Sequence, residues 1–459
     1  MAKQRESLSS RLGFLFLAAG CAIGLGNIWR FPFITGQNGG GMFVLLYLLF
    51  LLILGFPILV MELSIGRASR QNLVGGYRKL SAGHGKFPWQ RLGSLFFLGN
   101  LLLMMFYTTV SGWLLAYAWH YLTGDLAGYR GEGIQQFFDG LAGSSADSIL
   151  YMAIVVGLAV FICSIGLRNG VENSAKIMMS VLLLMLIVLA AKALMMPEAG
   201  RAVRFYLAPD FAKFSSVGIG EVVYAAMGQA FFTLSLGVGS MAIFGSYIER
   251  EHSLTKESLF IILLDTFVAI LAGLIIFPIC FSYGIDVGAG PRLVFVSLPN
   301  IFNDMAGGRW WGSLFFIFMT LAALTTVVAV FENLIAFLMD EGKMRRIAAT
   351  LTVGVGVFFL SLPCVLGFNA WSGVQPFGPG STILDLEDFI VSQNLLPLGS
   401  LYVLLFCVMR YGWGWKNFLA EADAGSGLKF PHRLKYYFFW VLPAIILMIF
   451  IVGYCKKFF

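Results

Sequence analysis

Residues 20–27 read Gly-Cys-Ala-Ile-Gly-Leu-Gly-Asn, and they lie inside the first long hydrophobic run of the chain. Three glycines and an asparagine in a run long enough to cross a membrane predict a helix that breaks at mid-membrane. A break exposes backbone N–H and C=O groups, which a bilayer tolerates only where protein or a bound solute satisfies them. We therefore expect a solute to bind here. The alternative is close helix packing, because Gly20 and Gly24 also form a GxxxG pair.

The composition indicates an integral membrane protein, because 59% of the 459 residues are hydrophobic and only 12% are charged. A membrane-spanning helix needs about 20 apolar residues. We predict an all-α polytopic membrane protein with about eleven transmembrane helices, near residues 11–35, 41–65, 92–120, 148–167, 173–195, 219–247, 257–285, 309–339, 345–368, 383–411 and 434–455. The first run is too long for the apolar core of a cleavable leader, so we expect no such leader.

Basic residues concentrate in alternate short loops, and such loops stay in the cytoplasm. The loop after the second run carries Arg67, Arg70, Arg78, Lys79, Lys86 and Arg91. We therefore predict a multi-pass protein of the cell inner membrane with a cytoplasmic amino terminus. The odd number of spans places the carboxyl terminus outside, although Lys456 and Lys457 oppose that step. The net charge of +7 follows from this topology, so we expect no nucleic-acid partner.

Other chemistries lack their usual sequence signals. The six cysteines all lie in or beside hydrophobic runs, so we expect no disulfide. The four histidines form no cluster with cysteines at metal-ligand spacing, which disfavours zinc and haem. No GxxxxGK[ST] motif is present, so ATP is not the evident energy source. We expect no enzyme and no organic cofactor, which leaves a transporter driven by an ion gradient or a channel.

A second hydrophobic run shows the same interruption. Residues 228–240 read Gly-Gln-Ala-Phe-Phe-Thr-Leu-Ser-Leu-Gly-Val-Gly-Ser, which places glycines and hydroxyls at mid-membrane. This run opens a second set of five spans, as residues 20–27 open the first set. Paired interruptions at corresponding positions of two halves indicate an inverted-repeat transporter with a midplane site. We predict one transmembrane transporter domain over residues 1–459, with pseudo-repeats at about 8–200 and 215–413 and an extra helix at about 434–455.

Several of these motifs together resemble one family. They are Arg11-Leu12-Gly13, residues 20–27, Arg30-Phe31-Pro32, Asn38-Gly39-Gly40-Gly41 and residues 229–237. The chain is similar to the neurotransmitter:sodium symporter family, in its bacterial, leucine-transporter-like amino-acid branch. The resemblance covers essentially all of the runs and is strongest in the first, sixth and eighth. It implies a 5+5 inverted-repeat fold with broken helices 1 and 6.

The resemblance also implies a binding site for an amino acid. The ends of half-helices supply N–H donors and positive potential to a carboxylate, so we favour the backbone of Leu25 and Gly26 together with the Tyr107 hydroxyl. Phe232 would cap the pocket from outside. Gly24 bears no acid where amine-selective relatives have one, which favours a substrate with its own carboxylate. The expected substrate residues are Cys21, Ala22, Gly24, Leu25, Gly26, Leu103, Tyr107, Phe232, Thr233, Ser235, Val238, Thr326 and Val330.

Sodium prefers hard oxygen donors, and the resemblance implies two sodium sites that share the broken first helix. The first comprises Ala22, Asn27, Thr233 and Asp265 together with the substrate carboxylate. The second comprises carbonyls of Gly20, Ile23 and Ala322 and the hydroxyls of Thr325 and Thr326. A Thr-Thr pair on a helix is by itself more often bonded back to the preceding turn, and that alternative stays open.

Asp265 departs from the asparagine that is common in the family. A carboxylate in this apolar run should face a partner or an ion. Animal relatives bind chloride nearby, and Ala269 occupies the position of their chloride-binding serine, although Tyr47, Gln229 and Thr233 remain. We infer that Asp265 supplies the negative charge and that chloride is dispensable. A structural salt bridge of Asp265 is the alternative.

Alternating access requires closures on both sides of the site. Outside, the resemblance pairs Arg30 with Asp388, and snorkelling of either side chain to the interface is the alternative. Inside, it pairs Arg5 with Asp340, assisted by Ser246 and Tyr247. Two family positions differ here, because Leu8 replaces a tryptophan of the inner closure and Ser180 replaces a proline expected to help the fifth span unwind. Glu62 and Glu332 are buried acids to which the sequence assigns no role.

These features predict sodium-coupled symport of a neutral, hydrophobic or aromatic L-amino acid by alternating access, independent of chloride. The partners are the amino acid, two sodium ions and the lipid bilayer. A substrate-gated ion channel that uses the same broken helices is the alternative. A membrane-embedded enzyme ranks third, because the sequence offers no Ser/His or metal constellation.

Overall fold

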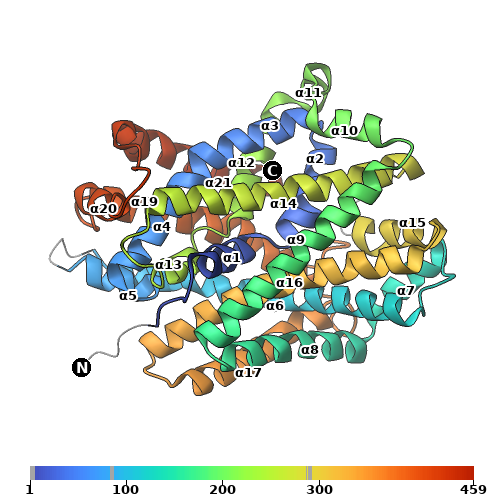
Figure 1. The fold of residues 1–459 in the computed structure, drawn as a ribbon, viewed down its shortest axis with the longest axis horizontal. Helices are drawn as coiled ribbons and strands as arrows, with labels where there is room; N and C mark the ends of the chain where they lie inside the picture. Colours follow the sequence, from blue (N-terminus) through green and yellow to red (C-terminus); the bar gives the residue numbers. More distant parts are fainter. Residues whose placement is uncertain (1–5, 83–86, 286, 288–291, 459) are drawn as a thin grey trace.

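The computed structural model describes residues 6–82, 87–285, 287 and 292–458. Within this part the chain is all-helical, and its long helices run roughly parallel to the long axis of the molecule (Figure 1). Nine described helical segments are long and apolar enough to cross a membrane, and the bent pair Arg11–Ala22 and Gly26–Gln37 makes ten. Because these lengths match the thickness of a bilayer, the structure confirms an all-α polytopic membrane protein.

The membrane-spanning helices lie close to the expected runs. Their bounds are α1 Arg11–Ala22, α2 Phe31–Gln37, α3 Gly41–Phe50, α4 Phe56–Ser69, α6 Trp89–Thr123, α8 Ser145–Ser164, α9 Asn173–Leu194, α12 Ile219–Thr233, α13 Ser240–Gly245, α14 Leu254–Tyr283, α16 Gly308–Asp340, α17 Arg346–Leu366, α18 Ile383–Asp388, α19 Leu396–Val408 and α21 Leu442–Phe458. Short π-helical turns join some of them, namely η1 Gly26–Arg30, η2 Leu51–Gly55, η3 Leu167–Glu172, η5 Phe389–Leu395 and η7 Tyr437–Val441.

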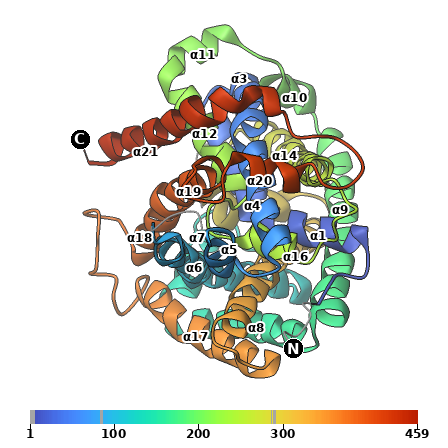
Figure 2. The same cartoon turned by 90° about the vertical axis from the view of Figure 1, so that its left-hand side faces the viewer.

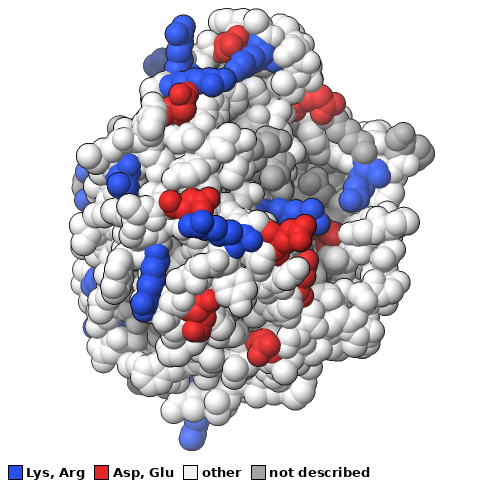
Figure 3. All heavy atoms as spheres, turned by 90° about the vertical axis from the view of Figure 1, so that its right-hand side faces the viewer, with Lys and Arg blue, Asp and Glu red and all other residues white. Residues whose placement is uncertain are grey.

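Shorter helices cover the two ends of the bundle. They are α5 Leu73–Leu80, α7 Glu132–Gly143, α10 Ala199–Leu207, α11 Phe211–Val217, η4 Leu293–Ser297, α15 Leu298–Asp304, α20 Trp415–Ala422 and η6 His432–Leu434. Figure 2 faces the end of the molecule that carries α5 and α20. Figure 3 faces the opposite end, where acidic and basic side chains are interspersed.

The first span is broken at the predicted place. Ser10 caps α1 by accepting a hydrogen bond from the Gly13 N–H, and α1 ends at Ala22. Ile23 then adopts an extended backbone, and the chain resumes as a π-helical turn at Gly26. The two halves meet at an angle of 57°. The backbone groups around residues 23–25 are therefore available to neighbouring side chains or to a solute.

The sixth run is interrupted over a longer stretch. The helix α12 ends at Thr233 and α13 begins at Ser240, so residues 234–239 are not helical. Ser235, Gly237 and Gly239 all have positive φ angles. Gly237 is required for a second reason, because a Cβ there would lie 2.5 Å from the Leu396 oxygen and the Ser400 nitrogen. The predicted pair of broken spans, the first and the sixth, is thus present.

The fifth span differs in its first turn from an ordinary helix. It starts as the π-helical turn η3, which contains Gly170, and continues as α9 through Ser180 without a break. Gly170 in this π-helical turn packs tightly, because a Cβ there would lie 2.0 Å from the Ile162 oxygen. The irregular backbone of this span therefore lies at its first turn rather than around Ser180.

Candidate functional site

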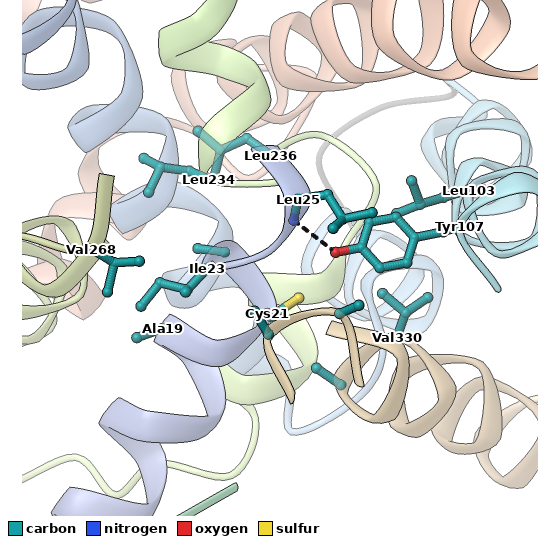
Figure 4. Close-up of a cluster of buried hydrophobic side chains, with 14 of the residues drawn as sticks. Ala19, Cys21, Ile23, Leu25, Leu103, Tyr107, Leu234, Leu236, Val268 and Val330 are labelled. Carbon is teal, nitrogen blue, oxygen red and sulfur yellow. Dashed lines mark hydrogen bonds between the residues drawn. The ribbon is translucent and has the colours of Figure 1, made fainter. Parts of the chain in front are cut away.

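The proposed substrate residues gather beside the break in the first span. The Leu25 N–H donates a hydrogen bond to the Tyr107 hydroxyl of α6, with 3.1 Å between nitrogen and oxygen. Figure 4 shows Leu103 and Tyr107 from α6 and Val330 from α16 around Leu25, with Cys21 below. These side chains are buried. The result is a buried apolar cluster with a single phenol directed at the backbone of the broken helix.

Gly24 lies against this apolar cluster. A Cβ at Gly24 would lie 2.3 Å from the Tyr107 hydroxyl oxygen and 2.7 Å from the Thr326 hydroxyl oxygen. Gly26 lies under the ring of Phe232, because a Cβ there would be 2.8 Å from the ring. Both glycines are therefore needed for two hydroxyls and an aromatic ring to approach the break closely. Ala22 and Thr233 are buried nearby, and Ser235 is half-buried in the second break.

A first cluster of oxygen atoms forms around Asp265 of α14. Its carboxylate accepts hydrogen bonds from Asn27 Nδ2 at 2.7 Å, from Thr233 Oγ1 at 3.0 Å and from the Tyr47 hydroxyl at 3.5 Å. Because Asn27 directs its nitrogen at Asp265, its oxygen Oδ1 faces the break, where the Gly24 N–H lies 3.4 Å away. We call Asn27, Thr233 and Asp265 the charged cluster. No ion pair involves Asp265 among the described residues, so the structure gives no support to the salt-bridge alternative.

A second cluster forms between α1 and α16. The Thr326 hydroxyl is 3.2 Å from the Gly20 oxygen, 3.3 Å from the Ile23 oxygen and 3.5 Å from the Ala322 oxygen. Thr325 donates back to the Ala322 oxygen at 2.8 Å. The five expected oxygen ligands therefore lie close together. We call them the neutral cluster: the carbonyls of Gly20, Ile23 and Ala322 and the hydroxyls of Thr325 and Thr326. Back-bonding within the helix is also present, and a hydroxyl that donates its proton still presents lone pairs to a cation.

A buried polar network that the sequence did not predict holds the second break. Asn100 of α6 donates to the Val238 oxygen at 2.7 Å and accepts from Ser240 at 2.9 Å and from Asn333 at 3.0 Å. The Gly237 N–H donates to Glu62, with 3.4 Å between the atoms. The available signal was an isolated asparagine in each of two apolar runs, because a polar side chain in a membrane span needs a partner.

Val238, an expected pocket residue, packs against α6. A Cβ on Gly99 would lie 2.7 Å from the Val238 side chain, so these two residues are in close contact. Gly99 precedes Leu103 by one helical turn of α6. Val238 therefore supports the wall that carries Leu103.

The outer closure is not paired as the resemblance implied. The Arg30 guanidinium lies over the Phe232 ring, 3.9 Å from its centre, and Asp388 accepts from Ser392 at 2.6 Å. Among the described residues, Arg30 and Asp388 form no ion pair. A cavity of about 430 Å³ is lined by Arg30, Phe232 and Ser392 among others. In this structure Arg30 stacks on the Phe232 ring, and its pairing with Asp388 stays a prediction.

The inner closure was expected to pair Arg5 with Asp340, and that pairing stays a prediction. Arg5 lies outside the described residues. Asp340 accepts from the backbone nitrogen of Asn72 at 2.9 Å and from its side chain at 3.0 Å. The Tyr247 hydroxyl donates to Glu332 at 2.8 Å, and Glu332 forms a 2.5 Å ion pair with Arg346. Glu332, to which the sequence assigned no role, thus joins α16 to the segment after α13 and to α17.

The start of the chain is fastened to the fifth span by a residue that the sequence also missed. Glu172 in η3 accepts from the Ser9 N–H, the Ser9 hydroxyl and the Ser10 hydroxyl at 2.7 to 2.9 Å, and it pairs with Lys176 at 2.6 Å. Arg168 donates to the Ser7 oxygen at 2.8 Å. These bonds hold residues 7–10 against the irregular first turn of the fifth span.

Comparisons with known proteins agree with this architecture. The sodium:neurotransmitter symporter family matches residues 5–133 and 139–457, so the chain belongs to that family. It is 34% identical to an uncharacterized sodium-dependent transporter of Haemophilus influenzae, over 98% of each chain. It is 32% identical to a similar protein of Bacillus subtilis, over 96% of each chain. A crystal structure of MhsT in complex with L-phenylalanine has 37% identity and a TM-score of 0.86, covering 97% of this chain and 99% of that one.

These matches confirm the expected family, the leucine-transporter-like fold and the class of a membrane transporter rather than an enzyme. Transport by this family is sodium-dependent, which makes sodium a partner of the chain.

Proposed function

We propose that the protein carries a neutral, hydrophobic or aromatic L-amino acid inward together with sodium, by alternating access around the broken first span. The observation that carries this proposal is that two oxygen clusters contact one break, beside a group of buried apolar side chains. The charged cluster, the neutral cluster and the apolar cluster all contain or contact residues 20–27. Binding of ions and of substrate would therefore order the same backbone segment, which is the physical basis of coupling.

The substrate carboxylate would lie against Leu25, Gly26 and the Tyr107 hydroxyl. Exposed N–H groups at the end of a half-helix attract an anion, and Tyr107 already reaches the Leu25 nitrogen. Residue 24 is a glycine, so the protein has no acid there to hold the amine of a substrate that lacks a carboxylate. This arrangement favours an amino acid over a monoamine.

The substrate side chain would lie against Leu103 and Val330, under the Phe232 ring. These walls are apolar, so hydrophobic and aromatic side chains would be selected by burial, which contributes about 25 cal/mol per Å² of apolar surface. The MhsT structure with bound L-phenylalanine supports the same class of substrate.

We assign one sodium ion to each cluster. In the first, Asn27 Oδ1, Asp265, Thr233, the Ala22 carbonyl and the substrate carboxylate would ligate the ion. In the second, the ligands would be the carbonyls of Gly20, Ile23 and Ala322 and the hydroxyls of Thr325 and Thr326. Oxygen donors of this kind suit hard cations. Because Asp265 brings its own charge, chloride would not be required.

The test is uptake into proteoliposomes under a defined sodium gradient. Labelled phenylalanine, tyrosine, tryptophan, leucine and methionine should accumulate above their external concentration, and dopamine-like amines should not compete. Collapsing the sodium gradient should abolish the accumulation. Currents that are gated by substrate but lack concentrative uptake would instead show the substrate-gated channel.

A further inference from the structure

A second cavity lies at the end of the bundle that carries α5 and α20. It has a volume of about 450 Å³, which is within the range of ligand pockets, about 300–1,000 Å³. Its walls are the end of α4, the loop before α14 and the helix α20, and α20 packs against α4 (Figure 2). The residues lining it are Arg67, Ala68, Arg70, Leu80, Arg250, Trp413, Asn417, Ala420 and Glu421. No part of the proposed transport site reaches this cavity.

Three arginines and one carboxylate line this cavity. Arg67 is fully buried, and it pairs with Glu421 at 2.7 Å and donates to the His252 oxygen at 2.6 Å. Arg250 pairs with the other oxygen of Glu421 at 2.6 Å, although 69% of its side chain is exposed. Arg70 donates to the Ser246 oxygen at 3.2 Å. One carboxylate thus holds two guanidinium groups in place, and the lining keeps a surplus of positive charge.

We propose that this arginine cavity binds a phosphate group, carried either by an anionic phospholipid or by a free phosphate ion. Guanidinium groups match phosphate oxygens in geometry and charge. Glu421 holds Arg250 in position in advance, so less side-chain entropy is lost on binding. The cavity also lies at the end of the membrane-spanning helix α4 and just before α14, where lipid headgroups border the bundle.

Occupancy would strengthen a contact that α4 already makes with the segment after α13. Arg70 bonds to Ser246, next to Tyr247 of the inner closure. A phosphate held by Arg70 and Arg250 would therefore tie α4 to the segment between α13 and α14.

The experiment uses the full-length protein in lipid nanodiscs. Retained phosphatidylglycerol is measured by native mass spectrometry in mixed phosphatidylcholine discs, and inorganic phosphate is titrated by thermal shift in pure phosphatidylcholine discs. We expect Arg250→Gln to weaken binding about fivefold, the effect of one arginine near anionic lipid. Arg250→Lys should keep most of the binding. Arg78→Gln is the matched control, because Arg78 is also exposed and paired, with Glu341 at 2.8 Å, but does not line the cavity.

Each outcome decides the proposal. Loss of phosphatidylglycerol in Arg250→Gln but not in Arg78→Gln supports a lipid headgroup, and a phosphate shift lost only in Arg250→Gln supports the free ion. Equal binding by wild type and Arg250→Gln overturns the proposal, as does an equal loss in Arg78→Gln. Arg70→Gln serves as a second variant if Arg250→Gln melts early in pure phosphatidylcholine.

Discussion

The two oxygen clusters beside the first break differ in charge and in construction. The charged cluster is made largely of side chains and contains the carboxylate of Asp265, which accepts three side-chain hydrogen bonds. The neutral cluster contains three backbone carbonyls and two hydroxyls. The first joins the broken span to α12 and α14, and the second joins it to α16. Substitution of side chains can thus remove most of the charged cluster. In the neutral cluster the three backbone carbonyls remain after any substitution.

This difference predicts unequal consequences for sodium binding. A carboxylate in a membrane interior is favourable only beside a cation or strong donors, so the charged cluster should depend steeply on one residue. Carbonyl ligands survive any substitution, so the neutral cluster should lose affinity in small steps.

The largest effect is expected for Asp265→Asn. Removal of the charge should lower sodium affinity roughly 30-fold in chloride-free buffer, because an interaction with a charged group contributes about 2 kcal/mol. Chloride should restore part of the affinity if Tyr47, Gln229 and Thr233 gather the anion. The measurement is the sodium dependence of phenylalanine binding to purified protein. Normal sodium affinity of this variant without chloride would remove Asp265 from the site.

The next largest effect is expected for Gly24→Ala, which disturbs Tyr107 of the apolar cluster and Thr326 of the neutral cluster together. The new Cβ would lie 2.3 Å from the Tyr107 hydroxyl oxygen and 2.7 Å from the Thr326 hydroxyl oxygen, so both hydroxyls must move. Overpacking of this kind costs about 1–3 kcal/mol, and phenylalanine affinity should fall about tenfold.

Gly157→Ala is the matched control for this substitution, because a Cβ at Gly157 in α8 meets no atom within 4 Å. Both variants are compared by equilibrium binding of labelled phenylalanine. Equal affinities in the two variants would show that Gly24 does not face the substrate.

A smaller effect is expected for the hydroxyls of the neutral cluster. Thr326→Ala and Thr325→Ala should each lower sodium affinity about fivefold, because one hydrogen-bonding group contributes about 1 kcal/mol. Thr320→Ala is the control, since Thr320 lies on the same helix and is bonded back to the Phe316 oxygen at 2.7 Å. If Thr325→Ala behaves like Thr320→Ala, the Thr325 hydroxyl serves only its own helix.

The sequence predicted both breaks because their causes are local. Glycines and hydroxyls within residues 20–27 and 228–240 disfavour a continuous helix wherever the rest of the chain lies. The members of the two clusters were expected through the family resemblance, and the structure brings them together. Their roles as ligands stay predictions.

The residues that the sequence missed act through distant partners. Asn100 meets Ser240 and Asn333, which are 140 and 233 positions away, so only the folded chain reveals the network. The same holds for Glu332, whose partners Tyr247 and Arg346 come from two other segments. The contact of Arg30 with Phe232 was also not predicted, because a cation beside an aromatic ring leaves no charge pattern in the sequence.

The smallest effect, and the sharpest contrast with Asp265→Asn, concerns wild-type protein without chloride. Replacement of chloride by gluconate should leave sodium-driven phenylalanine uptake unchanged. The donors that would hold an anion there are already directed at Asp265, since Asn27, Thr233 and Tyr47 all bond to its carboxylate. A chloride ion about 4 Å from that charge would be repelled by about 4 kcal/mol at an effective dielectric constant of about 20. Initial uptake rates in the two anions provide the measurement, with Asp265→Asn assayed in parallel as the variant that should respond. Uptake that rises several-fold with chloride in wild type would mean that Asp265 does not replace the anion, and the charged cluster would then need a different account.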